Sequence, residues 1–253
     1  MKLKAAFKFE IRDFLTTVFS VYGVMMLINI IAIVVQLASK NNFKTNMTLN
    51  GAEIILIVTV FIIAAGDFRE NFQMLMQNGV SRKTIFISKA GTGLMFALIL
   101  SIADRLFIFL SKIISNLAGV TKSTESVWIQ IYPEFADKHN AVWSFIAFAA
   151  VGAAVYICSY MLGTVLSGLI YRLGKGGRTA LAIALPVTAF VLVPLLLEIF
   201  WETAFVRWLI HTLVTILGLG KGIPYPAAAT FTVLSCILGA ASWLIIRRAV
   251  PKD

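Results

Sequence analysis

The sequence predicts an all-α, polytopic membrane protein with six transmembrane helices, organised as a single transmembrane domain over residues 1–253. Hydrophobic residues make up 59% of the chain and charged residues only 13%, about half the charged fraction of a soluble domain. Six apolar runs alternate with short polar segments, and a helix needs about 20 apolar residues to cross a bilayer. The predicted spans cover approximately residues 17–38, 52–66, 85–115, 141–169, 179–197 and 227–246.

The basic residues predict the orientation of these spans. If the N-terminus is cytoplasmic, 14 of the 22 Lys and Arg residues fall in cytoplasmic segments and 7 in outer segments, with Arg105 inside a span. An excess of Lys and Arg on cytoplasmic loops is the general rule for membrane proteins. The net charge of +10 therefore indicates topology, with both termini cytoplasmic, rather than binding to nucleic acid.

Residues 2–15 are predicted to form a separate basic amphipathic helix before the first span. Its basic stripe consists of Lys4, Lys8 and Arg12, and its apolar stripe of Leu3, Phe7, Ile11 and Phe14. Such a helix lies in the membrane interface, with its apolar face on the acyl chains and its lysines near anionic headgroups. A simple topogenic anchor is an equal alternative.

The first predicted span carries a polar face. Tyr22, Asn29 and Gln36 recur every seven residues, which places them on one side of a helix. Polar groups in hydrocarbon need partners, so this face is expected to meet other helices or a wet cavity. Hydrogen bonding between helices is favoured over contact with a transported substrate.

Asp67 to Phe86, between the second and third spans, predicts a short helix, a turn and a new helix. Phe68, Phe72 and Leu75 form one helix face. Gly79 is placed as the glycine that ends this helix, and Ser81 as the N-cap of the next. The apolar face is predicted to contact a protein partner, with contact to the bilayer as the alternative.

The third predicted span contains two adjacent charges, Asp104 and Arg105, about three quarters of the way across a hydrocarbon core of about 30 Å. Adjacent residues on a helix point about 100° apart, so the two cannot be assumed to pair with each other. Charges inside a membrane are functional candidates by default. In the alternative, Arg105 reaches the interface and Asp104 bonds a neighbouring helix.

The last two spans frame a long outer segment. The fifth span is interrupted by Pro186 and Pro194, and proline kinks a helix because it lacks a backbone donor. Residues 198–226 follow, and helical spacing predicts an amphipathic helix on or dipping into the membrane. The residues that carry this spacing are Phe205, Leu209, Leu213 and Ile216.

Motifs for catalysis are missing from the sequence. It has no H-E-x-x-H zinc motif, no G-x-S-x-G nucleophile turn and no Walker A loop. No metal site is expected. Two histidines, His139 and His211, both fall in outer segments. We therefore do not expect an enzyme, but a conduit or scaffold whose energy, if it transports anything, comes from elsewhere.

The whole layout resembles the ABC-2 type transporter permeases, and Gly79-Val80-Ser81-Arg82-Lys83 resembles a turn common in small Gram-positive members that export peptides or drugs. The resemblance implies a permease of the bacterial cell membrane that exports an amphipathic or hydrophobic substrate. Residues 2–15 would be an elbow helix, and the outer segment would be re-entrant. Spans one and five of two protomers would line the path.

The resemblance also implies partners. A separate nucleotide-binding subunit would hydrolyse ATP, with ATP and Mg²⁺ bound there and no cofactor on this chain, and a second permease protomer would complete the transporter. Residues 68–79 would be the coupling helix that docks on the ATPase, through Phe68, Arg69, Glu70, Phe72, Leu75, Met76 and Gly79. The alternative function is an ATP-independent membrane scaffold or immunity protein that sequesters an amphipathic peptide.

Overall fold

A computed structural model describes residues 2–38, 51–66, 68–117, 125–173, 187–201 and 203–248, together with Gly177, Ala180 and Ala184. All secondary structure in these residues is helical, which confirms the predicted all-α class. The α-helices are α1 (Lys2–Ala38), α2 (Ala52–Gly66), α3 (Phe68–Gln77), α4 (Arg82–Leu117), α5 (Val127–Ile131), α6 (Pro133–Lys138), α7 (Ala141–Arg172), α9 (Val193–Phe200), α10 (Ala204–Ile216) and α11 (Tyr225–Arg247). A π-helix (Thr188–Leu192) and a 3₁₀ turn (Leu219–Lys221) complete them.

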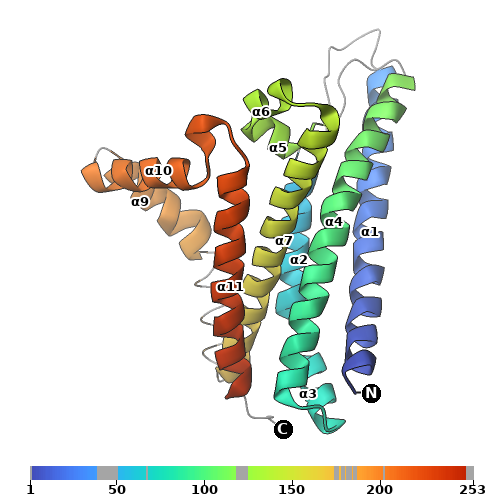
Figure 1. Ribbon diagram of the computed structural model, residues 1–253, viewed down its shortest axis with the longest axis vertical. Coiled ribbons are helices and arrows are strands. Elements are labelled where there is room, and N and C mark those ends of the chain that lie inside the picture. Colours follow the sequence, from blue (N-terminus) through green and yellow to red (C-terminus); the bar gives the residue numbers. More distant parts are fainter. Residues whose placement is uncertain are drawn as a thin grey trace.

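Four of the described helices are long and apolar enough to cross a membrane: Phe14–Val35 within α1, and all of α4, α7 and α11. These indicate a membrane protein, and they run along the long axis of the molecule (Figure 1). The predicted count of six spans is not confirmed. With 15 residues, α2 is only about 22 Å long, less than the hydrocarbon thickness of about 30 Å.

The fifth predicted span, 179–197, lies largely outside the described residues, and so does Pro186. The described part changes from a π-helix to an α-helix next to Pro194, which occupies the first turn of α9. The proline ring crowds the carbonyl four residues earlier and offers no N–H to it. Nearly all of α9, Pro194–Phe200, then turns by 119° into α10, and this bent pair would be a fifth span if it counts as one.

The bundle has two distinct ends (Figure 1). The start of α1, the whole of α3 and the last turn of α11 lie together at one end, which we call the α3 end. Helices α5 and α6 lie at the opposite end, the α5 end, and α10 projects sideways near it. Both ends of the chain therefore approach the same side of the bundle as α3.

Residues 2–15 do not form a separate helix, because α1 is continuous from Lys2 to Ala38. Phe14 is buried, and its ring stacks on Phe96 of α4 with centroids 3.7 Å apart. Ile11 packs partly buried against the same core, and Lys8 is exposed. Ile11 and Phe14 of the apolar stripe thus pack inside the bundle. The side chains of Lys4 and Arg12 lie outside the described part.

The turn between α3 and α4 matches its prediction. Gly79 has φ 67, a left-handed conformation that glycine adopts without strain. The N–H of Val80 bonds the Leu75 carbonyl at 3.0 Å, which closes a Schellman motif. The Ser81 hydroxyl accepts a bond from the Thr84 N–H at 3.2 Å and caps α4. Capping therefore determines where α3 ends and α4 begins.

The α5 end is closed by aromatic packing. Trp128, Tyr132 and Phe135, from α5 and α6, are buried against Phe148 of α7. The Tyr132 hydroxyl donates a bond of 2.7 Å to the Leu217 carbonyl, at the turn after α10. Burial raises the pKa of the Tyr132 phenol, so it stays protonated and keeps donating at neutral pH. These contacts join α5 and α6 to the α10–α11 turn.

Helices α2 and α7 approach closely at Gly163. A Cβ at this position would lie 2.6 Å from the Phe61 carbonyl oxygen and 2.8 Å from the Ala64 Cβ. Four residues earlier along α7, the Ser159 hydroxyl donates to the Ile57 carbonyl at 2.8 Å. Small residues that admit a neighbouring backbone are a common basis of helix association in membranes.

Gly163→Ala is expected to destabilise the chain by about 1–3 kcal/mol, because the added methyl group forces two backbones apart. The measurement is the free energy of unfolding in mixed detergent micelles. Gly23→Ala in α1 is the matched control, since nothing lies within 4 Å of its would-be Cβ. A helical Gly→Ala change in open space stabilises by about 0.5–1 kcal/mol. Equal effects of the two substitutions would argue against the close contact.

Candidate functional site

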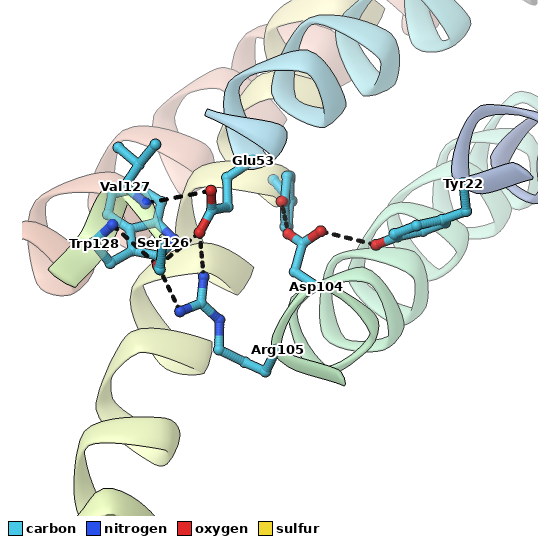
Figure 2. A network of polar contacts seen from close by, with 8 residues as sticks. Tyr22, Glu53, Asp104, Arg105, Ser126, Val127 and Trp128 are labelled. Atoms are coloured by element: carbon cyan, nitrogen blue, oxygen red, sulfur yellow. Dashed lines mark hydrogen bonds and ion pairs between the residues drawn. The ribbon is translucent and has the colours of Figure 1, made fainter. Parts of the chain in front are cut away.

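The buried charges of α4 form the centre of the candidate site (Figure 2). Asp104 and Arg105 are both buried. Because they are adjacent on a helix, their side chains leave α4 in different directions. Asp104 faces α1 and α7, whereas Arg105 faces α2 and the start of α5. They form no ion pair with each other.

Arg105 forms an ion pair with Glu53, in the first turn of α2. Its Nη2 lies 2.6 Å from Glu53 Oε1, and the two residues are 7% and 0% exposed. The Arg105 guanidinium is therefore held inside the bundle rather than exposed on its surface. A buried pair of this kind is stable only when its remaining polar atoms are also hydrogen-bonded.

Ser126 provides those bonds at the N-cap of α5. Its hydroxyl accepts from Arg105 Nη1 at 2.7 Å and donates to Glu53 Oε1 at 2.7 Å. The Ser126 hydroxyl oxygen also accepts from the Trp128 N–H. Glu53 Oε2 accepts from the Val127 N–H at 3.3 Å. One carboxylate thus joins the beginning of α2, the middle of α4 and the beginning of α5.

The Asp104 carboxylate accepts hydrogen bonds from two tyrosines on different helices. Tyr22 of α1 donates to Asp104 Oδ1 at 2.9 Å, and Tyr156 of α7 donates to Oδ2. The expectation that Asp104 bonds a neighbouring helix is confirmed, with two helices rather than one. Through Asp104 and Arg105 together, α4 is bonded to α1, α2, α5 and α7.

Helices α1 and α4 run in parallel with a constant offset in sequence. Hydrogen-bonded side-chain pairs and one aromatic stack join the two helices, and the two residues of each pair are 82 positions apart in the sequence. The pairs are Glu10 with Thr92, Phe14 with Phe96, Tyr22 with Asp104, and Asn29 with Ser111. Interhelical hydrogen bonding of the polar face of α1 is confirmed for Tyr22 and Asn29. The side chain of Gln36 lies outside the described part.

At the α3 end, a separate apolar cluster fastens α3 to the bundle. Phe72 is 0% exposed, and its ring meets Tyr171 of α7 edge-on, with centroids 5.6 Å apart. Leu75, on the same face of α3, is also buried. Ile85 of α4 and Ile246 of α11 belong to the same cluster. One face of α3 therefore packs against the end of α7, within a cluster that also includes the start of α4 and the end of α11.

Two arginines at the same end join α4 and α7 to α11. Arg82 of α4 donates to the Arg247 carbonyl, and Arg172 of α7 donates to the Ile245 carbonyl, each at 2.9 Å. The last carbonyls of a helix have no partner within it and carry partial negative charge. The positive side chains of α4 and α7 thus cap the end of α11.

The residues predicted to dock on an ATPase therefore need correction. Phe72 and Leu75 pack inside the chain, so they are not exposed to a partner. Met76 is half-buried and Gly79 is exposed. The side chains of Phe68, Arg69 and Glu70 lie outside the described residues. An amphipathic stripe does not reveal which surface it faces, and here it faces the bundle.

Two buried acids were missed by the sequence analysis. Glu53 lies at the edge of the second predicted span, and a lone acid at the start of an apolar run is the signal that could have indicated a buried ion pair. Glu10 was placed on an interfacial helix. It is buried and accepts bonds from Ser88 at 3.2 Å and Thr92 at 3.0 Å, with Lys89 Nζ 3.9 Å from its other oxygen.

Chemically, these side chains join helices. The bonds of Glu53, Asp104 and Arg105 all run to protein groups, and no group of three or more His, Cys, Asp or Glu among the described residues could hold a metal ion. The chain was also compared with protein-family models, with curated proteins and with solved structures. None of them matches it.

Proposed function

We propose that this chain is the transmembrane permease subunit of an ABC exporter in a bacterial cell membrane. It moves an amphipathic or hydrophobic substrate, and a separate nucleotide-binding subunit hydrolyses ATP. The observation that carries the proposal is the attachment of α3. Its buried face packs on Tyr171 of α7, in a cluster that also includes residues of α4 and α11, and we infer that a displacement of α3 is passed to the long helices through this cluster.

In this proposal the two faces of α3 have different roles. The buried face, with Phe72 and Leu75, transmits movement to the bundle. The exposed residues at the end of α3 and in the following turn, Gln77, Asn78 and Lys83, contact the ATPase. This division retains the coupling role inferred from the resemblance, but assigns docking to polar residues rather than to the apolar stripe.

The finer topology is part of the same proposal. Both termini and α3 are cytoplasmic, and α2 and residues 179–197 complete six spans. The outer segment 198–226, which contains α10, enters the outer membrane surface and returns. A second permease protomer completes the path. The start of α1 acts as an elbow that is packed on α4 rather than lying free in the interface.

Site-specific photo-crosslinking tests the proposal in the native host. A photoreactive residue at Gln77 is expected to give an adduct with a subunit that carries a Walker A motif. The same residue at Asp137, which is exposed on α6 at the opposite end, is the matched control and should give none. The purified complex should also hydrolyse ATP.

Two results would contradict the permease proposal. If Gln77 gives no adduct with an ATPase, or gives the same adduct as Asp137, the coupling role is wrong. The scaffold alternative predicts that protection against an amphipathic peptide persists when the Walker A lysine of the proposed ATPase subunit is substituted. The permease proposal predicts that this protection disappears.

A further inference from the structure

A cavity of about 420 Å³ lies at the α5 end, between α4, α5, α6 and α7, next to Arg105 and the aromatic cluster. This volume is within the range of small-molecule sites. Its walls are mostly apolar, and two of its rings, Phe109 of α4 and Phe145 of α7, are also exposed on the surface of the bundle. The cavity therefore borders the face that a membrane protein presents to acyl chains.

Positive charge lies on the α4 side of this cavity. Arg105 lines it, but its guanidinium is already neutralised by Glu53 and bonded to Ser126. Lys112, two turns further along α4, also lines it. No acidic side chain of the described residues pairs with Lys112 within 4.0 Å. Lys112 therefore provides the positive charge available to a ligand.

A hydroxyl group at the opposite wall has no partner. Ser144 of α7 lines the cavity and is 9% exposed, and its buried Oγ has no hydrogen-bond partner among the described residues. A serine inside a helix commonly bonds the carbonyl four residues earlier, and Ser144 does not. A buried hydroxyl without a partner is costly, so a ligand that accepts its hydrogen bond would remove this cost.

The beginning of α7 adds to the same preference. Ser144 lies in the first turns of this 32-residue helix, whose N-cap, Asn140, makes no side-chain capping bond. The N-terminus of a helix carries unpaired N–H groups and partial positive charge. A lysine, an unpartnered hydroxyl and a helix N-terminus thus surround one cavity with apolar walls.

We propose that this cavity binds an anionic phospholipid of the surrounding bilayer. The phosphate accepts hydrogen bonds from Lys112 and Ser144, and the upper part of one acyl chain packs between Phe109 and Phe145. A zwitterionic lipid fits less well, because its ammonium group would lie near Lys112. A free fatty acid shares the anionic head and the chain, and the experiment separates it from the phospholipid.

The test measures which lipids stay bound to the full-length chain. The purified protein is placed in vesicles of equal amounts of phosphatidylglycerol and phosphatidylcholine, extracted, and its bound lipids are quantified by mass spectrometry. Wild type is expected to retain phosphatidylglycerol preferentially. In Lys112→Gln this preference should fall about tenfold, since one charged hydrogen bond is lost.

Two further variants distinguish lipid binding in this cavity from a general effect of losing a positive charge or of changing stability. Lys138→Gln removes an exposed lysine on α6, at the same end of the bundle, and should bind lipid as wild type does. Ser144→Ala should lower the preference for phosphatidylglycerol and also raise the unfolding midpoint in lipid-free detergent, because it removes a buried hydroxyl without a partner. If Ser144 had only a structural role, Ser144→Ala would instead lower the unfolding midpoint.

The proposal is overturned if all variants retain the same lipids, or if Lys138→Gln loses as much as Lys112→Gln. It is also overturned if oleate fully displaces phosphatidylglycerol at equal concentration, because the ligand would then be a free carboxylate. If Lys112→Gln does not fold, Ser144→Ala decides the question. The inference does not depend on the proposed export function.

Discussion

Replacing Arg105 with Met is expected to destabilise the chain by about 3–5 kcal/mol, because removal of one partner leaves the other charge buried. Glu53, which is 0% exposed, would lose its counter-charge and Ser126 one of its donors. The side chain of Met has a similar length, so packing changes little. The measurement is the free energy of unfolding of the full chain in mixed detergent micelles.

Two controls identify the cause of the loss. The double variant Glu53→Gln with Arg105→Met should recover most of the stability, because replacing a whole buried pair by neutral groups is often nearly neutral. Lys138→Ala breaks the exposed pair with Glu134, and pairs of this type contribute only about 0.3–0.5 kcal/mol. If Arg105→Met costs no more than Lys138→Ala, the buried pair does not stabilise the fold.

Phe72→Ala is expected to cost about 3–5 kcal/mol, as large-to-small changes of buried phenylalanines do. The loss should be concentrated at the α3 end, because the ring packs on Tyr171 in the cluster that also holds Ile246. Amide hydrogen exchange should therefore quicken in α3 while the α5 end keeps its protection. Gln77→Ala, at an exposed position of α3, is the control and should change neither quantity.

The same variant distinguishes transmission from docking. If the buried face transmits movement, Phe72→Ala should keep the crosslink from Gln77 to the ATPase but lose transport. If Phe72 is itself a docking residue, the crosslink should disappear together with transport. Unchanged exchange in α3 would show that Phe72 does not fasten this helix.

Helix boundaries were the most predictable part of this fold, because local chemistry sets them. Gly79 and Ser81 mark the turn between α3 and α4 through a left-handed φ and a capping hydroxyl, and both act within a few residues. The long apolar helices were predictable for a similar reason, since their composition alone distinguishes them. The number of spans was not, because α2 has only 15 residues.

Partners distant in sequence were harder to predict. A break between two helices was expected near residue 16, because the composition changes there from basic to apolar. However, the buried face of α1 continues across it, from Phe14 to Val18 and Met25. Glu53 reveals its role only through Arg105, 52 positions away. The orientation of α3 likewise depends on Tyr171 and Ile246, which no local pattern of that segment encodes.

The constant offset between α1 and α4 has a consequence for how the chain is made. The polar groups of α1 that lie in its spanning part, Tyr22 and Asn29, find their partners only on a helix synthesised 82 residues later. At about 5–20 residues per second, a ribosome needs several seconds to produce α4. During that interval these two polar groups have no partner on α4. The hydrogen bonds between α1 and α4 therefore form only after both helices have been made.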